Sequence, residues 1–243
     1  MKIVIINGSP RKGNTYAATQ IFKNEMTTCG DIEFIEFFLP QDLPEFCRGC
    51  MLCLEKKEQL CPHSEYTLPI LDAIIAADAI IFTTPVFVLQ APGAVKNFLD
   101  HFAFMFIVHR ARPEMFCKKA FVLSTTAGAG TKAAMKTIIT NLKFWGVNRI
   151  FSFGFNIFGI DFENMNPNRK AKVEKKLKKS AKRFYIEAAI GKKRSPYWLT
   201  RFMFYLRRSM LKKEDEKLSA TDESGTADKR YWIKQNWFKE NPF

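Results

Sequence analysis

The fold is decided by the N-terminal stretch MKIVIINGSPRKGNT, residues 1–15. Its apolar run, Ile3–Ile6, has the composition of a short buried strand, and it opens directly into a loop of small and basic residues. A strand, such a loop and then a helix are a common way of holding a phosphate on backbone N–H groups at the helix start. The rest of the sequence must indicate which phosphate-bearing molecule this loop would hold.

Four more short apolar runs alternate with segments of helical periodicity. The predicted strands are Ile3–Ile6, Ile32–Phe38, Ala79–Phe82, Phe121–Leu123 and Val147–Phe155. This alternation predicts a doubly wound α/β domain, in which helices cover both faces of a five-stranded parallel sheet. Ligands bind such sheets beyond the carboxyl ends of the strands, so the loops after the first, third and fourth strands form the candidate site.

The composition of the 243 residues suits one large domain with an extension. Hydrophobic residues make up 47% of the chain, which is ample for a core, yet no run approaches the ~20 apolar residues that span a bilayer. The N-terminal run is also too short for a signal peptide. We therefore expect a cytoplasmic protein with an α/β domain over residues 1–190 and a basic, aromatic C-terminal extension over residues 191–243.

Positive charge is concentrated in the C-terminal third. Residues 1–160 carry a net charge of +3, whereas residues 161–243 carry +11. Within that third, residues 196–208 (PYWLTRFMFYLRR) combine basic side chains with a helical apolar stripe. We interpret this segment first as a helix packed on a partner subunit and second as a membrane-surface helix; a nucleic-acid contact is the least favoured.

The opening loop resembles a triphosphate-binding loop without its lysine. Residues 8–15 have the G-x-x-x-x-G-x-T spacing of that motif, but Asn14 stands where the lysine would reach the outer phosphates. A single terminal phosphate could still accept hydrogen bonds from Ser9, Arg11, Asn14 and Thr15. The alternative is an ordinary strand–turn–helix corner with a capping residue.

The other two loops suit a flat ring. After the third strand, TTPVFVLQAPG (residues 83–93) places apolar and aromatic side chains where polar loop residues are usual. This loop alone does not separate ring binding from packing on a neighbouring subunit. After the fourth strand, TTAGAG (residues 125–130) imitates a dinucleotide fingerprint, but no Asp or Glu lies between Glu114 and Asp161 to bind the ribose. We interpret its small residues as letting a ring edge approach the backbone.

Together, GSPRKGNT, TPVFVLQAPGAVKNFLD and STTAGAG resemble the NAD(P)H-dependent FMN reductase and iron-sulfur flavoprotein family of the flavodoxin-like superfamily, over roughly residues 1–190. The resemblance implies strand order 2-1-3-4-5, an FMN cofactor, NAD(P)H as co-substrate, a small-molecule electron acceptor and a homodimer. It implies an FMN phosphate site at Ser9, Arg11, Gly13, Asn14 and Thr15. It implies ring contacts at Pro85, Val86, Phe87 and Val88, and contacts to the far ring edge at Thr125, Thr126, Ala127 and Gly128.

The chain departs from the family pattern at two places. It has Phe87-Val88-Leu89-Gln90 where the family usually has Tyr or Trp followed by Gly-Asn, and Ala127 where Gly is common. We therefore expect ring stacking and access to the flavin to differ from the family norm.

Four of the six cysteines lie close together in the segment after the second strand: Cys47, Cys50, Cys53 and Cys61. This spacing resembles the compact motif of the iron-sulfur flavoproteins and suits a [4Fe–4S] cluster, whose four irons each take one thiolate. It does not match the two separated C-x-x-C pairs of a zinc site. The alternative is free thiols, made reactive by Arg48, Lys56 and Lys57.

The sequence therefore supports one preferred function and two alternatives. The preferred function is an FMN-dependent NAD(P)H oxidoreductase that passes electrons to a quinone, a nitro compound or a second flavin. The first alternative is an iron-sulfur flavoprotein that carries electrons to a redox protein partner. The second, a basic module on anionic surfaces, leaves the three loops unexplained. No catalytic side chain is assigned, because hydride transfer through a flavin needs no protein nucleophile; His101 and His109 are interpreted as structural.

Overall fold

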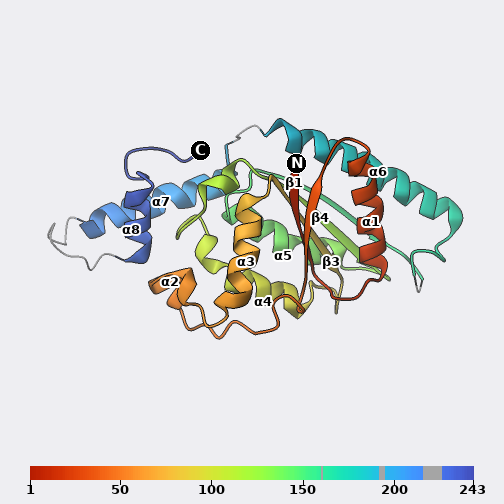
Figure 1. The fold of residues 1–243 in the computed structure, drawn as a ribbon, viewed down its shortest axis with the longest axis horizontal. Coiled ribbons are helices and arrows are strands. Elements are labelled where there is room, and N and C mark those ends of the chain that lie inside the picture. Colours follow the sequence, from red (N-terminus) through yellow and green to blue (C-terminus); the bar gives the residue numbers. More distant parts are fainter. Residues whose placement is uncertain (160, 192–194, 216–225) are drawn as a thin grey trace.

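The computed structural model describes residues 1–159, 161–191, 195–215 and 226–243 (Figure 1). Its centre is a parallel sheet made of β1 (Lys2–Asn7), β2 (Glu33–Phe38), β3 (Ala79–Pro85), β4 (Lys119–Thr126) and β5 (Arg149–Asn156). The strand order is β2-β1-β3-β4-β5, which confirms the predicted fold class and order. Strand β4 is longer than its apolar run because polar residues at both of its ends also pair with β3.

Helices cover both faces of the sheet. On one face lie α1 (Asn14–Thr27) and α6 (Pro167–Ile190); on the other lie α3 (Ser64–Ala76), α4 (Gly93–His101) and α5 (Thr131–Phe144) (Figure 1). Successive side chains of β1 point to opposite faces, so Ile3 enters the core under α1 and α6 while Val4 enters the other core. A strand that is buried on both faces must be apolar at every position, which explains the continuous runs in the sequence.

Two parts of the chain lie outside this alternation. The cysteine-bearing segment after β2 contains the short helix α2 (Leu52–Glu55) and the 3₁₀ turn η1 (Glu58–Leu60). Two further 3₁₀ turns, η2 (Ala103–Met105) and η3 (Pro113–Phe116), follow α4. Because the backbone of the cysteine segment is largely irregular, its polar groups must find hydrogen-bond partners on neighbouring elements.

The C-terminal extension packs against the sheet domain through α7 (Trp198–Asp215) and α8 (Ala227–Lys234). The helix expected within residues 196–208 is confirmed from Trp198 onward. Phe204 of α7 stacks on Trp232 of α8, with ring centroids 4.7 Å apart, and both join a buried cluster with Ile107 and Phe116 of the sheet domain. Among the described residues, no helix is long and apolar enough to cross a bilayer.

Candidate functional site

The three loops selected from the sequence line one cavity at the carboxyl edge of the sheet. Its volume is about 330 Å³, a size typical of small-molecule sites. The lining residues are Ser9, Arg11, Gly13, Asn14, Thr15, Pro85, Val86, Phe87, Thr125, Thr126, Ala127 and Ile157. Of the predicted site residues, Val88 and Gly128 are not among them. Ile157 was missed, because it follows the fifth strand, where no motif drew attention.

The first loop presents a helix start to this cavity. The N-cap of α1 is Gly13, which makes no side-chain capping hydrogen bond, and the first turn carries no acidic residue. The N–H groups of a first helical turn have no partner within the helix and carry the positive end of the helix dipole. Thr15 Oγ1 lies 2.6 Å from Thr125 Oγ1, which ties the first loop to the third. This end of the cavity therefore suits an anion.

Two glycines allow the loops to approach one another. A Cβ atom at Gly8 would lie 2.7 Å from the carbonyl oxygen of Thr83, so a side chain there would push the first loop off β3. Gly130 has a φ of +103°, and a Cβ there would lie 2.9 Å from Leu89 Cα in the second loop. Any larger residue would also be strained at that φ. The spacing of the three loops thus depends on both positions.

The second loop ends in a strained turn at the rim of the cavity. Phe87 and Gln90 exchange two backbone hydrogen bonds of 2.9 and 3.0 Å, so Val88 and Leu89 are the central residues of a tight hairpin. Their φ angles are +47° and +63°, and the Val88 side chain is 96% exposed. Such turns usually contain Asn-Gly, because β-branched side chains clash in the left-handed region. Strain of this kind is concentrated at functional sites.

Replacing this turn with its preferred residues should stabilise the protein. We expect the double variant Val88→Asn, Leu89→Gly to raise the free energy of unfolding of the monomer by about 1–2 kcal/mol, because it relieves left-handed strain at two positions. Denaturant titration measures the change. Val88→Ala is the matched control: it removes the branched side chain but keeps a Cβ, so the gain should be smaller. A loss of stability in the double variant would mean that the apolar side chains make contacts that outweigh the strain.

The four clustered cysteines line a second cavity, with a volume of about 280 Å³. Within the described ranges, the only group of three or more potential metal-ligand atoms that lie within 4.8 Å of one another is that of Cys61, His63 and His101. The four sulfur atoms are therefore spread more widely than a single tetrahedral zinc ion requires, since its Zn–S bonds are ~2.3 Å long. Four thiols spread around one cavity fit a cluster of several metal ions better.

The electrostatics of this cavity disfavour free thiolates at Cys53 and Cys61. Burial, together with the neighbouring thiols of Cys61, Cys47 and Cys50, raises the pKa of Cys53 to about 11. Burial likewise raises the pKa of Cys61. The cation that acts on Cys53 is Arg110, not the basic residues named from the sequence, and its effect is smaller than that of burial. A bound metal would supply the positive charge that holds such thiols deprotonated.

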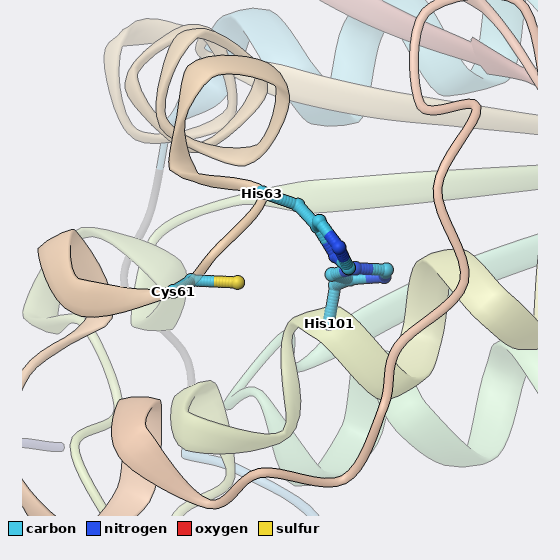
Figure 2. Close-up of side chains that lie close together, drawn as sticks. All are labelled: Cys61, His63 and His101. Atoms are coloured by element: carbon cyan, nitrogen blue, oxygen red, sulfur yellow. The ribbon is translucent and has the colours of Figure 1, made fainter.

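Two buried histidines, His63 and His101, also line this cavity. Figure 2 shows them beside Cys61. His101 Nδ1 lies 3.0 Å from the carbonyl oxygen of Asn97, which only accepts, so this nitrogen carries the proton. His101 Nε2 then accepts from His63 Nδ1 at 3.0 Å. Burial lowers the pKa of His101, which favours this neutral form. His63 Nε2 is left as a buried acceptor with no hydrogen-bond partner among the described residues.

The cysteine segment is held in place from two sides. On one side, Asn97 of α4 accepts from the Cys47 N–H at 2.8 Å and donates to the Glu45 carbonyl. On the other, the buried Arg110 donates to the carbonyl oxygens of Cys53 and Leu54. Helix α4 follows the second loop of the first cavity along the chain, and its Asp100 and His101 line the second cavity.

Arg110 is itself held by the C-terminal extension. Its Nη1 lies 2.8 Å from Oδ1 of Asp228 in α8, and Asp228 Oδ2 lies 2.7 Å from His109 Nδ1. Glu58 lies 3.7 Å from Arg110 and also pairs with Arg112, and Arg207 lies 3.7 Å from Asp228. The structural role expected of His109 is thus consistent with its contacts. The sequence did not indicate this network, because its partners lie 118 residues apart and follow no motif.

Comparison with known proteins places these features in context. A family model described as NADPH-dependent FMN reductase matches residues 1–157. The chain is 28% identical to an iron-sulfur flavoprotein of Methanocaldococcus jannaschii over 199 residues, 76% of this chain and 96% of the relative. It is 32% identical to an iron-sulfur flavoprotein of Archaeoglobus fulgidus over 100 residues, 41% of this chain and 48% of that relative, about half of its length.

The fold also matches solved structures. An FMN-dependent NADH-azoreductase from Bacillus anthracis, in complex with FMN, superimposes with a TM-score of 0.60 at 12% identity, covering 76% of this chain and all of that one. At this identity the likeness establishes the fold alone.

Proposed function

The chain belongs to the NADPH-dependent FMN reductase family, and from this premise we propose that the cavity between its three loops holds FMN and that its electron acceptor is a small molecule. The protein is an FMN-dependent NAD(P)H oxidoreductase. FMN held in this cavity would supply the hydride and electron-transfer chemistry between NAD(P)H and a small acceptor such as a quinone, a nitro compound or a second flavin. The observation that carries the proposal is the meeting of three separate loops around one cavity.

Each loop has a distinct part in holding the cofactor. The open start of α1, together with Ser9, Arg11 and Thr15, binds the phosphate through N–H and hydroxyl donors. The second loop presents Pro85 and Phe87 as an apolar wall against the ring, which also excludes water. The Val86 N–H donates to the Thr125 carbonyl at 3.1 Å, so that amide joins the second loop to the third and does not face the ring.

Arg11 should contribute directly to FMN affinity. We expect Arg11→Ala to weaken FMN binding by roughly 1–3 kcal/mol, because a charge-assisted hydrogen bond to the phosphate is lost. Fluorescence titration of the flavin-free protein measures the dissociation constant. Lys12→Ala is the matched control, since Lys12 is a neighbouring exposed cation that does not line the cavity. Equal losses in the two variants would indicate a general charge effect, and no loss in Arg11→Ala would remove the assignment.

Flavin extraction tests the whole proposal. Denaturing the purified protein should release about one FMN per chain, and the native protein should oxidise NADH or NADPH in steady state when a quinone is present. Protein that releases no flavin and binds none on addition would overturn the proposal.

A second function is favoured by the cysteine cavity, which fits a [4Fe–4S] cluster on Cys47, Cys50, Cys53 and Cys61. Such a cluster exchanges single electrons. The chain would then be an iron-sulfur flavoprotein, as its curated relatives are named, carrying electrons between FMN and a redox protein partner. Here Asn97 and Arg110 would hold the ligand loop. Slow turnover with quinones but rapid reduction by a ferredoxin-type donor would favour this function; the opposite result would favour the reductase.

We also propose that the protein is a homodimer in which the subunits meet over the FMN cavity. Large apolar side chains are exposed on loops at the same edge of the sheet: Phe46, Phe87, Val88, Leu89 and Phe158. Exposed apolar residues gathered near a pocket commonly mark an interface. Sedimentation velocity should show a dimer at micromolar concentration; a monomer would contradict this assignment.

A further inference from the structure

Helix α7 has a second face that nothing in the described structure covers. Its inner face is anchored: Phe204 and Leu211 are fully buried, and the Thr200 hydroxyl donates to the Lys143 carbonyl at 3.1 Å. The outer face carries exposed apolar side chains at helical spacing: Leu199, Phe202, Leu206 and Met210. Residues spaced in this way form one stripe along the helix.

Aromatic and basic side chains border this stripe. Trp198 and Tyr205 lie one helical heptad apart beside it, and Trp198 is 77% exposed. Arg201 and Lys212 are exposed on the flank beyond them. The order across the helix is therefore apolar, aromatic and cationic, which is the arrangement of helices that lie in a membrane interface.

The charge of the sequence around this face is mainly positive, and the acidic residues Glu214 and Asp215 come only at the end of α7. From residue 188 to residue 213 there are eight Lys or Arg and no Asp or Glu. A second copy of the chain seated on the same face about a twofold axis would bring these cationic segments together, which is unfavourable. Nucleic acid would satisfy the cations but offers no apolar surface for Leu206 and Met210. An anionic bilayer surface complements both the charge and the apolar stripe.

We propose that the outer face of α7 is a membrane-docking surface that binds bilayers containing anionic lipids. The apolar stripe enters the boundary between headgroups and acyl chains, while Arg201 and Lys212 contact lipid phosphates. The helix lies parallel to the surface, because its inner face stays packed on the sheet domain. The FMN-loop cavity is built from other elements, so membrane binding does not depend on the flavin.

Vesicle co-sedimentation of the full-length protein tests the proposal. The protein should bind vesicles of phosphatidylcholine with phosphatidylglycerol, bind pure phosphatidylcholine much more weakly, and release as salt is raised. Two double variants, Phe202→Ser with Leu206→Ser and Arg201→Gln with Lys212→Gln, should each weaken binding at least ~10-fold. All four positions are exposed, so these variants should fold normally.

Matched controls come from α6. Ile186→Ser with Ile190→Ser, and Lys176→Gln with Lys179→Gln, change exposed residues of the same types and should leave vesicle binding unchanged. Three results would overturn the proposal. They are absence of binding to anionic vesicles, conversion of a dimer to a monomer by the Phe202→Ser, Leu206→Ser variant, and retention on nucleic acid that only the charge variant reduces.

Discussion

Replacing Asp228 with Asn should lower the free energy of unfolding by about 3–5 kcal/mol, because it removes one partner of a buried ion pair. The side chain of Arg110 is only 5% exposed, and its Nη1 lies 2.8 Å from the Asp228 carboxylate. An amide keeps the shape of the carboxylate but not its charge, so the guanidinium would remain buried with Glu58 as its nearest anion, 3.7 Å away. Denaturant titration of the flavin-loaded protein measures the loss.

A surface ion pair provides the control for this experiment. Lys170 lies 2.6 Å from Glu163, whose side chain is 77% exposed. Because exposed pairs contribute ~0–1 kcal/mol, Glu163→Gln should change stability little. If Asp228→Asn also costs less than about 1 kcal/mol, then Glu58 and the carbonyl oxygens of the cysteine segment are sufficient partners for Arg110. The extension would then not be needed to hold that segment.

Replacing Cys53 with Ser should remove nearly all of the iron bound by protein purified without oxygen. If the four cysteines ligate a [4Fe–4S] cluster, the unaltered protein should contain about four irons per chain, and loss of one thiolate should leave the cluster unstable. Colorimetric iron assay and the visible spectrum measure the change. The FMN content should stay the same, because Cys53 does not line the FMN-loop cavity, and retained flavin shows that the variant has folded.

Cys117→Ser is the matched control, since this thiol is exposed and lies outside the cysteine cavity. It should leave iron and flavin unchanged. Unaltered protein that contains flavin but no iron would exclude the cluster and make the protein a simple FMN reductase. A Cys53→Ser variant that retains its iron would show that this residue is not a ligand, and equal loss in both variants would indicate adventitious iron.

Much of the sheet domain could be predicted because its signals are local. A strand buried on both faces must be apolar throughout, so the run Ile3–Ile6 predicted β1. The glycines that follow indicated the tight turn into α1. Parallel strands place their carboxyl ends at one edge, so the loops after β1, β3 and β4 could be expected to meet. In the structure they do line one cavity.

The cysteine cavity was predictable in part. The spacing of Cys47, Cys50, Cys53 and Cys61 indicated that four thiols would lie together, and in the structure all four line one cavity. The sequence could not reveal their protonation, because the pKa of Cys53 is governed by burial, a property of the packed structure. The hydrogen bond between His63 and His101 could not be predicted either, because the two rings are 38 residues apart in the sequence and meet only in the packed structure.

The sequence by itself determined the alternation of strands and helices, the loops that line the first cavity and the grouping of the four cysteines, because each depends on contacts between near neighbours or on the geometry of parallel strands; the strand order came from the family resemblance. Only the tertiary structure decided which side chains of the C-terminal extension are buried and which face solvent. One of its charges, Asp228, is buried against Arg110; others, such as Lys212, stay in solvent. The amino-acid pattern of a basic amphipathic helix does not show which face packs inward, since that depends on long-range contacts with the sheet domain.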